Sequence, residues 1–395
     1  MGVYTRSRWD SRADLSLPML RLFYGLMLGS MAALIPLLGG RFERQGLDGV
    51  TIGLLMALLP LGRLLSVPLW AWWADRYQAA GLVLRVACVL SAVAGMVVAR
   101  AEEVWVLGLA MFCFSAMRAP LGAITDVFVM DALRARGRSL AEYGRTRLFG
   151  SLGFMVGVIL ASAPFAGPWL SDVGLIATAA VAFAFPTRGE GGPAPVWPAL
   201  VALVKQRWLL PLLLAGCLQA FTLSVYDCFL SVHVAALGLP EWVVGAAFAV
   251  GVACETTLMA WARPLLGRVG PAGGLLLAAA VNVPRWAITA WTDDPAVLVG
   301  VQVLHGVAFG MFWVSGVQRM AHGAPAHVAA SAQSLWSAAS YGVGSLAGQA
   351  LAGEARALGG TAAIFEMLAG VSVLATVAAG WLWRVDGKGD EARRG

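Results

Sequence analysis

The fold class of this chain is decided by the stretch Glu142-Tyr-Gly-Arg-Thr-Arg-Leu-Phe-Gly-Ser-Leu-Gly-Phe154. It leads into an apolar run that continues to Pro164, and a run of this kind is typical of a membrane-spanning helix. Arg147 lies at the head of the run. A cation inside a bilayer costs at least about 2.5–3.5 kcal/mol, so it is normally paired and faces protein or water.

On a helix, Arg147, Ser151 and Phe154 share one face, because they are spaced i, i+4 and i+7. That face presents a cation, a hydroxyl and an aromatic ring. Two interpretations of Arg147 stay open: its side chain snorkels to the lipid headgroups, or it lines a polar cavity. The cavity is favoured because Asp126, on the preceding apolar segment, is a candidate partner.

The whole chain has the composition of a membrane protein. Its 395 residues are 59% hydrophobic and 13% charged, which is too little charge to cover a soluble surface. Apolar segments near the roughly 20 residues that cross a bilayer take up almost the entire chain. We therefore expect an all-α membrane protein with twelve transmembrane helices. The candidate spans are residues 17–38, 50–74, 81–99, 104–131, 146–164, 168–186, 209–236, 242–262, 271–291, 296–320, 328–351 and 361–383.

A linker divides these spans into two sets of six. Residues 187–205 are rich in glycine and proline, which favours an irregular segment. The predicted organisation is a six-helix half at residues 1–186, a cytoplasmic linker at 187–207 and a second half at 208–395. Two pseudo-symmetric halves of this kind are the usual build of a large class of secondary transporters.

The basic residues predict the orientation of the chain. With the N-terminus inside, twenty Lys and Arg residues fall on the cytoplasmic side and four fall outside. The positive-inside rule then places both termini in the cytoplasm, in a membrane that we expect to be a bacterial inner membrane. The basic residues are spread over seven segments, so they give no basis for a nucleic-acid partner. The sequence suggests neither a metal nor another cofactor.

The second half carries ionisable residues on four separate spans: Asp227, Glu255, Arg285 and His305. A single buried polar residue usually serves packing. Four together are costly in lipid unless they gather around an aqueous site. Aromatic residues Tyr226 and Phe309 fall on two of these spans, and Tyr341 falls on the next span, the eleventh.

At these residues the chain resembles the major facilitator superfamily, in the branch that holds lactose permease, nucleoside permeases and the phenylpropionate permease. The resemblance covers essentially the whole chain. The matching blocks are Phe23-Tyr24…Pro36, Ile52-Gly53…Pro68-Leu-Trp70…Ala74-Asp75-Arg76, Tyr143-Gly-Arg-Thr-Arg-Leu-Phe-Gly-Ser-Leu-Gly153, Pro284-Arg285-Trp286 and Gln302-Val-Leu-His305-Gly-Val-Ala-Phe-Gly310. Asp75-Arg76 is common to the superfamily, whereas the last two blocks are more particular to the branch.

The resemblance implies roles for individual residues. Asp126 and Arg147 match positions that bind substrate, and Phe154 matches the ring that stacks on it. Glu255, Arg285 and His305 match the group that couples a proton to the substrate. The full substrate-binding set that we expect is Asp126, Arg147, Ser151, Phe154, Tyr226, Glu255, Phe309 and Tyr341. The proton-coupling set is Asp227, Glu255, Arg285 and His305, and Asp75 with Arg76 forms a conformational motif.

Two departures from the lactose members concern the proton. Those members keep a glutamate three residues beyond the histidine, where this chain has Ala308. They also keep a lysine in the eleventh span to balance the seventh-span aspartate, and this chain has none there. Asp227 therefore needs another partner, for which Arg285 is a candidate.

The function expected from these observations is proton-coupled uptake of a small organic solute such as a sugar, a nucleoside or an aromatic acid. Proton-driven efflux of amphipathic compounds and uncoupled uniport remain as alternatives. A membrane enzyme is disfavoured, because no nucleophile or carboxylate cluster accompanies His322 and His327. The expected partners are the solute, protons and membrane lipid, and the expected state is a monomer.

Overall fold

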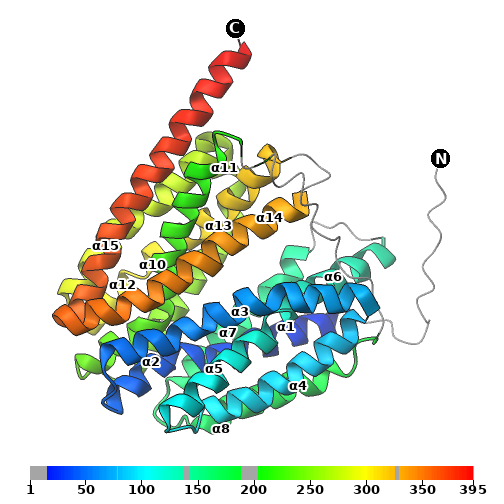
Figure 1. The fold of residues 1–395 in the computed structure, drawn as a ribbon, viewed down its shortest axis with the longest axis vertical. Coiled ribbons are helices and arrows are strands. Elements are labelled where there is room, and N and C mark those ends of the chain that lie inside the picture. Colours follow the sequence, from blue (N-terminus) through cyan, green and yellow to red (C-terminus); the bar gives the residue numbers. More distant parts are fainter. Residues whose placement is uncertain are drawn as a thin grey trace.

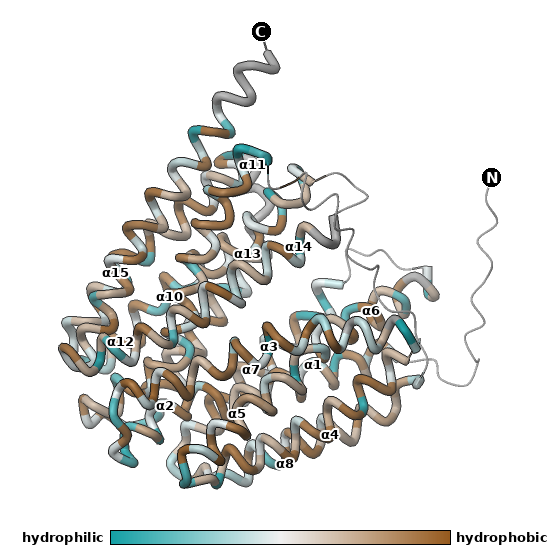
Figure 2. Tube along the Cα trace, viewed as in Figure 1, coloured by the Kyte–Doolittle hydropathy of each residue, from teal (hydrophilic) through white to brown (hydrophobic). Residues whose placement is uncertain are grey.

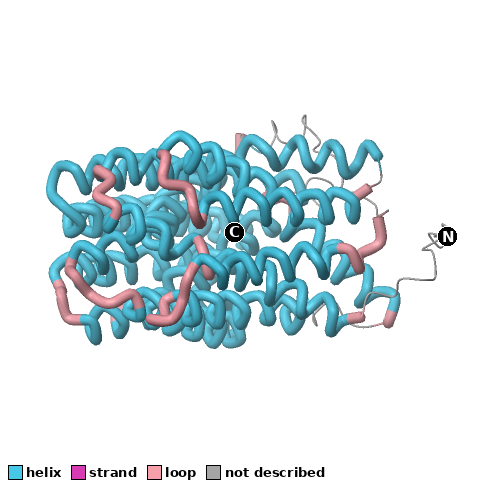
Figure 3. The backbone as a smooth tube through the Cα atoms, turned by 90° about the horizontal axis from the view of Figure 1, so that it is seen from below, coloured by secondary structure: helices cyan, strands magenta, loops and turns pink. Residues whose placement is uncertain are grey.

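The computed structural model describes residues 16–77, 79–137, 143–187, 203, 205–324 and 329–394, and the regular elements in these ranges are helices (Figure 1). Figure 3 shows the same helices from below, joined by short loops. The first group comprises α1 (Leu17–Ala32), α2 (Ile35–Arg44), α3 (Gly49–Tyr77), α4 (Ala80–Val98), α5 (Val104–Arg118), α6 (Leu121–Ala135), α7 (Tyr143–Ala161) and α8 (Pro168–Ala182). The second comprises α10 (Leu209–Ala236), α11 (Trp242–Trp291), α12 (Pro295–Gly300), α13 (Val303–Gly323), α14 (Ala329–Ser337), the π-helix η3 (Ala338–Gly344) and α15 (Ser345–Arg394).

Glycine breaks divide the two longest helices. In α11 the break is at Gly270, with φ of 68°, and in α15 it is at Gly359 and Gly360, where Gly360 has φ of 73°. Glycine adopts positive φ without the steric cost that other residues meet. Each of these helices therefore turns back on itself and provides two passes, at the positions where the sequence separates its candidate spans.

The all-helical membrane fold expected from the sequence is confirmed. Eight helical segments of the described chain are long and apolar enough to cross a membrane, and the arrangement is consistent with twelve passes. Hydrophobic residues predominate along the helices (Figure 2), and many large apolar side chains are exposed. Leu69, Trp105 and Trp291, for example, are 68%, 71% and 76% exposed. Such a surface suits lipid rather than water.

Glycines set the distance between α1 and α7. A Cβ at Gly29 would lie 2.8 Å from the carbonyl oxygen of Gly153, and Gly25 and Gly157 take part in the same close contact. Small residues at such positions let two membrane helices approach closely. This contact brings the polar start of α7 against the middle of α1, and so places Arg147 beside Tyr24.

The two groups of helices are joined at one end of the molecule, which we call the closed end. Ion pairs link Glu43 to Arg356 and Arg44 to Glu241, and the Gly40 amide donates to Ser231 Oγ at 3.0 Å. From this end, where α2 and α12 lie, the groups diverge toward the end that carries α6, α14 and the C-terminus (Figure 1).

The predicted division into halves and linker stays a prediction, because most of residues 187–207 lie outside the described residues. The conformational motif is also only partly described. Arg76 is exposed near the end of α3, with its guanidinium 6.0 Å from the Tyr77 ring centroid. The side chain of Asp75 lies outside the described part of the chain.

Gly353→Leu is expected to open the closed end. A Cβ at Gly353 would lie 2.9 Å from Gly53 Cα, and backbone there has no room to yield. Overpacking of this kind costs about 1–3 kcal/mol, here against the closed arrangement alone. Spin labels on Glu103 and Asp293, exposed in loops of the two groups, should therefore report longer separations. Gly370→Leu is the matched control, since no atom lies within 4 Å of its Cβ position; equal distances in both variants would contradict the prediction.

Candidate functional site

Tyr24 links the two charged residues of the first half. Its hydroxyl donates to the Asp126 carboxylate, and the Arg147 guanidinium lies 5.6 Å from the centroid of its ring. Tyr143, at the start of α7, also interacts with Tyr24 and Asp126. The α1–α7 contact therefore gathers two phenols, a carboxylate and a guanidinium from α1, α6 and α7.

The direct pairing of Asp126 with Arg147, expected from the sequence, is corrected by this geometry. No ion pair joins them among the described side chains, because Tyr24 satisfies the carboxylate and offers its ring to the guanidinium. Arg147 remains exposed. Its Nη1 lies 3.1 Å from the Cβ position of Gly150, one turn further along α7. The side chain thus points along the helix toward the membrane interior, which disfavours snorkelling.

A row of rings crosses from the first half to the second. Phe154 lies 6.0 Å from Phe248 of α11, and Phe248 lies 5.0 Å from Tyr226 of α10. Tyr226 lies 5.5 Å from the His305 ring, which stacks on Phe309 at 5.6 Å. Phe248 therefore connects Phe154 to Tyr226, and the His305 ring connects Tyr226 to Phe309. Ser151 is half-buried on α7.

Arg285 is fully buried, and its guanidinium forms hydrogen bonds with two side-chain amides. It donates to Gln302 Oε1 at 3.1 and 2.7 Å and to Asn282 Oδ1 at 3.3 Å. Its guanidinium also lies 4.3 Å from the Tyr226 ring centroid and 3.9 Å from that of Trp286. These neutral amides and rings hold the cation without a carboxylate.

Asp227 is exposed, although Tyr226 and Cys228 on either side of it are buried. Its carboxylate makes no hydrogen bond or ion pair with any residue that the structure describes. The expected partnership with Arg285 is therefore absent at contact distance, because the amides of Gln302 and Asn282 occupy that guanidinium.

Glu255 and His305 form the second polar contact of this half. Glu255 Oε2 lies 3.8 Å from His305 Nε2, and the two side chains are 14% and 7% exposed. The other nitrogen, His305 Nδ1, is buried with no hydrogen-bond partner among the described residues. Ala308 is buried and its carbonyl accepts from Gln219, so this position offers no substitute for the missing glutamate.

Tyr341 lies on the π-helical segment η3, where its ring packs 6.1 Å from Phe312 and 5.7 Å from Trp313. It interacts electrostatically with Asp227 and Glu255. Tyr341, the residue of the eleventh span that we expected in the site, therefore interacts with the carboxylates that α10 and α11 carry.

Sequence reasoning missed two contributions to this site. Tyr24 was visible within a motif, yet nothing in the sequence showed that its hydroxyl would reach Asp126. Phe248 carries no motif at all and is identified by its ring contacts with Phe154 and Tyr226.

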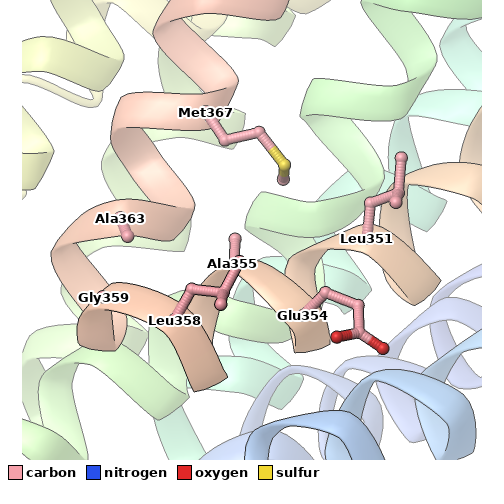
Figure 4. A pocket seen from close by; sticks show the side chains of 7 residues that line it. All are labelled: Leu351, Glu354, Ala355, Leu358, Gly359, Ala363 and Met367. Atoms are coloured by element: carbon pink, nitrogen blue, oxygen red, sulfur yellow. The ribbon is translucent and has the colours of Figure 1, made fainter.

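A separate apolar groove lies beside the break in α15 (Figure 4). Leu351, Leu358 and Met367 line it, and Glu354 is its charged residue. None of the charged residues described above contributes to this groove, so it is not the candidate site.

Comparison with known proteins identifies the family. The model of the MFS_1 like family matches residues 17–367. A maltose permease of Geobacillus stearothermophilus is 29% identical, over 82% of this chain and 83% of its own. A probable 3-phenylpropionic acid transporter of Escherichia coli is 28% identical, over 70% of this chain and 74% of its own.

A solved structure agrees in fold. The crystal structure of the nucleoside transporter NupG superposes with a TM-score of 0.79, over 93% of this chain and 98% of that one. At 18% sequence identity this likeness concerns the fold alone. The family model covers most of the chain, so this protein belongs to the MFS_1-like family of the major facilitator superfamily, and is a membrane transporter.

Proposed function

We propose that this transporter is a proton symporter that takes up a small organic solute by alternating access. The supporting observation is the set of charged side chains between the two groups of helices. Arg147 and Asp227 are exposed there, and Glu255 lies beside His305. Charged groups within a membrane fold that lack close partners are typical of a substrate or ion pathway.

The solute is held between the first and second halves. Arg147 supplies donors from α7, and the row Phe154–Phe248–Tyr226 supplies flat apolar surfaces from both groups. Rings beside a few polar groups are typical of sites for small organic molecules. The relatives named above suggest a sugar, an aromatic acid or a nucleoside as the first solutes to test.

The proton is carried by the carboxylates of the second half. When the halves close around Glu255, water leaves and the neutral, protonated form is favoured. When the site opens, water returns and the proton is released. His305, at 3.8 Å, is placed to receive or return that proton. No cofactor is required for this cycle.

Proteoliposomes test this function. The purified protein is reconstituted, and maltose, uridine and 3-phenylpropionate are added in turn to a weakly buffered outer solution. A transported solute should raise the external pH, because protons enter the vesicles with it. Solute uptake without a pH change would instead support uniport. Acidification of the outer solution when the solute is added would support proton-driven efflux, because an antiporter releases protons as the solute enters.

We further propose a bacterial inner-membrane location with both termini in the cytoplasm, and a monomer as the working unit. The excess of basic residues on one side supports this orientation. The closed end would then face outward and the divergent end would face the cytoplasm.

Reporter fusions test the orientation. Green fluorescent protein fused after Gly395 should fluoresce, because it folds in the cytoplasm. Alkaline phosphatase inserted in the loop at Asp293 should be active, because that enzyme needs the periplasm. An active phosphatase at the C-terminus would contradict the proposed orientation.

A further inference from the structure

Arg63 lies midway along α3 and is exposed, yet it does not face the lipid. The exposed apolar stripe of α3 includes Leu65, Leu69 and Trp72. At about 100° per residue, Arg63 stands about 200° from Leu65 around the helix. The next residue, Leu64, packs against the second half, with Cδ1 2.8 Å from the Cβ position of Gly342 in η3. Arg63 thus lies opposite the exposed apolar stripe, and it interacts electrostatically with Tyr341 of η3.

The Arg63 guanidinium has no hydrogen bond or ion pair with the residues that the structure describes. Two other arginines within the helices, Arg118 and Arg285, are occupied. Arg118 donates to the Met27 carbonyl and lies 5.3 Å from the Phe114 ring centroid, and Arg285 donates to two amides. A cation at mid-span with free donors requires water or a solute as its partner.

Tyr341 is the residue of the second half that interacts with Arg63. Its hydroxyl interacts electrostatically with Arg63, Asp227 and Glu255. It lies on the π-helical segment η3, and such segments are frequent at functional sites. A guanidinium of the first half and two carboxylates of the second half thus interact electrostatically with one phenol.

We propose that Arg63 binds a carboxylate group of the transported solute, so that the substrate is a small organic anion. This inference rests on the proposed symport. The planar guanidinium matches a carboxylate with two parallel hydrogen bonds, which neutral hydroxyls do not reproduce with the same strength. The row of rings from Phe154 to Tyr226 receives the apolar body of the anion.

An anionic solute also explains how solute uptake is coupled to proton uptake. Its negative charge, placed near Asp227 and Glu255, favours the protonated form of a neighbouring carboxylate because like charges disfavour ionisation. One anion and one proton then enter together. The pair carries no net charge, so a pH gradient should drive uptake while a membrane potential alone should not.

A pair of probes that differ in charge tests the proposal. Binding of 3-phenylpropionate and of its neutral amide, 3-phenylpropionamide, is measured on the detergent-solubilised full chain. The wild-type protein should prefer the carboxylate by at least about tenfold, the loss expected for a charge-assisted hydrogen bond. Arg63→Gln should reduce the ratio to near one, and Arg63→Lys should restore part of it.

Arg118→Gln is the control, because it removes a cation that is engaged by a carbonyl of α1. It should lower the melting temperature and leave the affinity ratio unchanged. The ratio separates binding from folding, since a loss of folded protein lowers both affinities together. A wild-type protein that binds the amide as well as the carboxylate, or binds neither, would overturn the proposal. So would an Arg63→Gln variant that keeps the preference.

The two proposals fail in different ways. Proton-coupled uptake of maltose that Arg63→Gln leaves unchanged would overturn the anion site and keep the symport. Arg63-dependent binding of the carboxylate without proton movement would keep the anion site and overturn the symport.

Discussion

Replacing Glu255 by glutamine should abolish pH-driven accumulation of the solute while leaving exchange across the membrane. Glutamine has nearly the same size but cannot take up a proton at neutral pH. The carboxylate has His305 at 3.8 Å as its closest ionisable partner among the described residues, and accepts no described hydrogen bond. The substitution therefore removes the proton without breaking a structural contact, and the site can still open alternately to each side.

The measurement uses labelled solute in proteoliposomes with an imposed pH gradient. Wild-type protein should concentrate the solute, whereas Glu255→Gln should stop at equal concentrations inside and outside. Glu354→Gln is the control, because Glu354 is an exposed carboxylate in the separate groove of α15. Accumulation by Glu255→Gln equal to that of wild type would show that another group carries the proton, with Asp227 the next candidate.

The fold could be predicted from the sequence because the bilayer restricts the solutions so strongly. Without water to satisfy the backbone, an apolar run of the right length must be helical. The breaks also fell where expected: Gly270 separates the predicted spans 242–262 and 271–291, and Gly360 separates 328–351 from 361–383. The lengths of the apolar segments and the positions of these glycines are therefore sufficient to predict the helical passes.

The contacts of individual cations could not be predicted in the same way. Arg63 and Arg118 look alike in sequence, since each is an arginine within an apolar run. In the structure the Met27 carbonyl occupies Arg118, whereas no described residue forms a hydrogen bond or ion pair with the Arg63 guanidinium. Helical periodicity gives the relative direction of two residues on one helix. It does not say which neighbouring helix lies in that direction.

The same limit explains the error over Asp126 and Arg147. The two residues lie on adjacent spans, which made an ion pair between them plausible. The free-energy cost of burying a single charge also favoured the pair. The phenol that separates them comes from α1, more than a hundred residues from Asp126. Only the close α1–α7 contact at Gly29 and Gly153 brings that ring into place.

Removing Arg147 is therefore expected to weaken substrate binding by about tenfold or more with little loss of stability. Arg147 is exposed, so water screens its electrostatic interactions with Glu255 and Tyr143. Its contact with the Tyr24 ring is a cation–π interaction worth about 0.5–1 kcal/mol at an exposed site. Arg147→Gln should lower the free energy of unfolding by no more than that. The solute meanwhile loses a charged donor, which should weaken binding by about tenfold or more.

Arg285 provides the matched comparison, because it is also a mid-span arginine but is fully buried and donates to Gln302 and Asn282. Arg285→Gln would leave two buried amides short of a donor, at about 1–3 kcal/mol for each unsatisfied group. Melting temperature and equilibrium binding of the solute, measured in detergent, should therefore separate the two variants. Arg147→Gln should melt close to wild type with clearly weakened binding, whereas Arg285→Gln should melt markedly lower. Retained binding in Arg147→Gln would place the solute on the second half alone. An equally low melting temperature in both variants would show that Arg147 is structural. A guanidinium whose only role is to bind the solute contributes little to the stability of the solute-free protein.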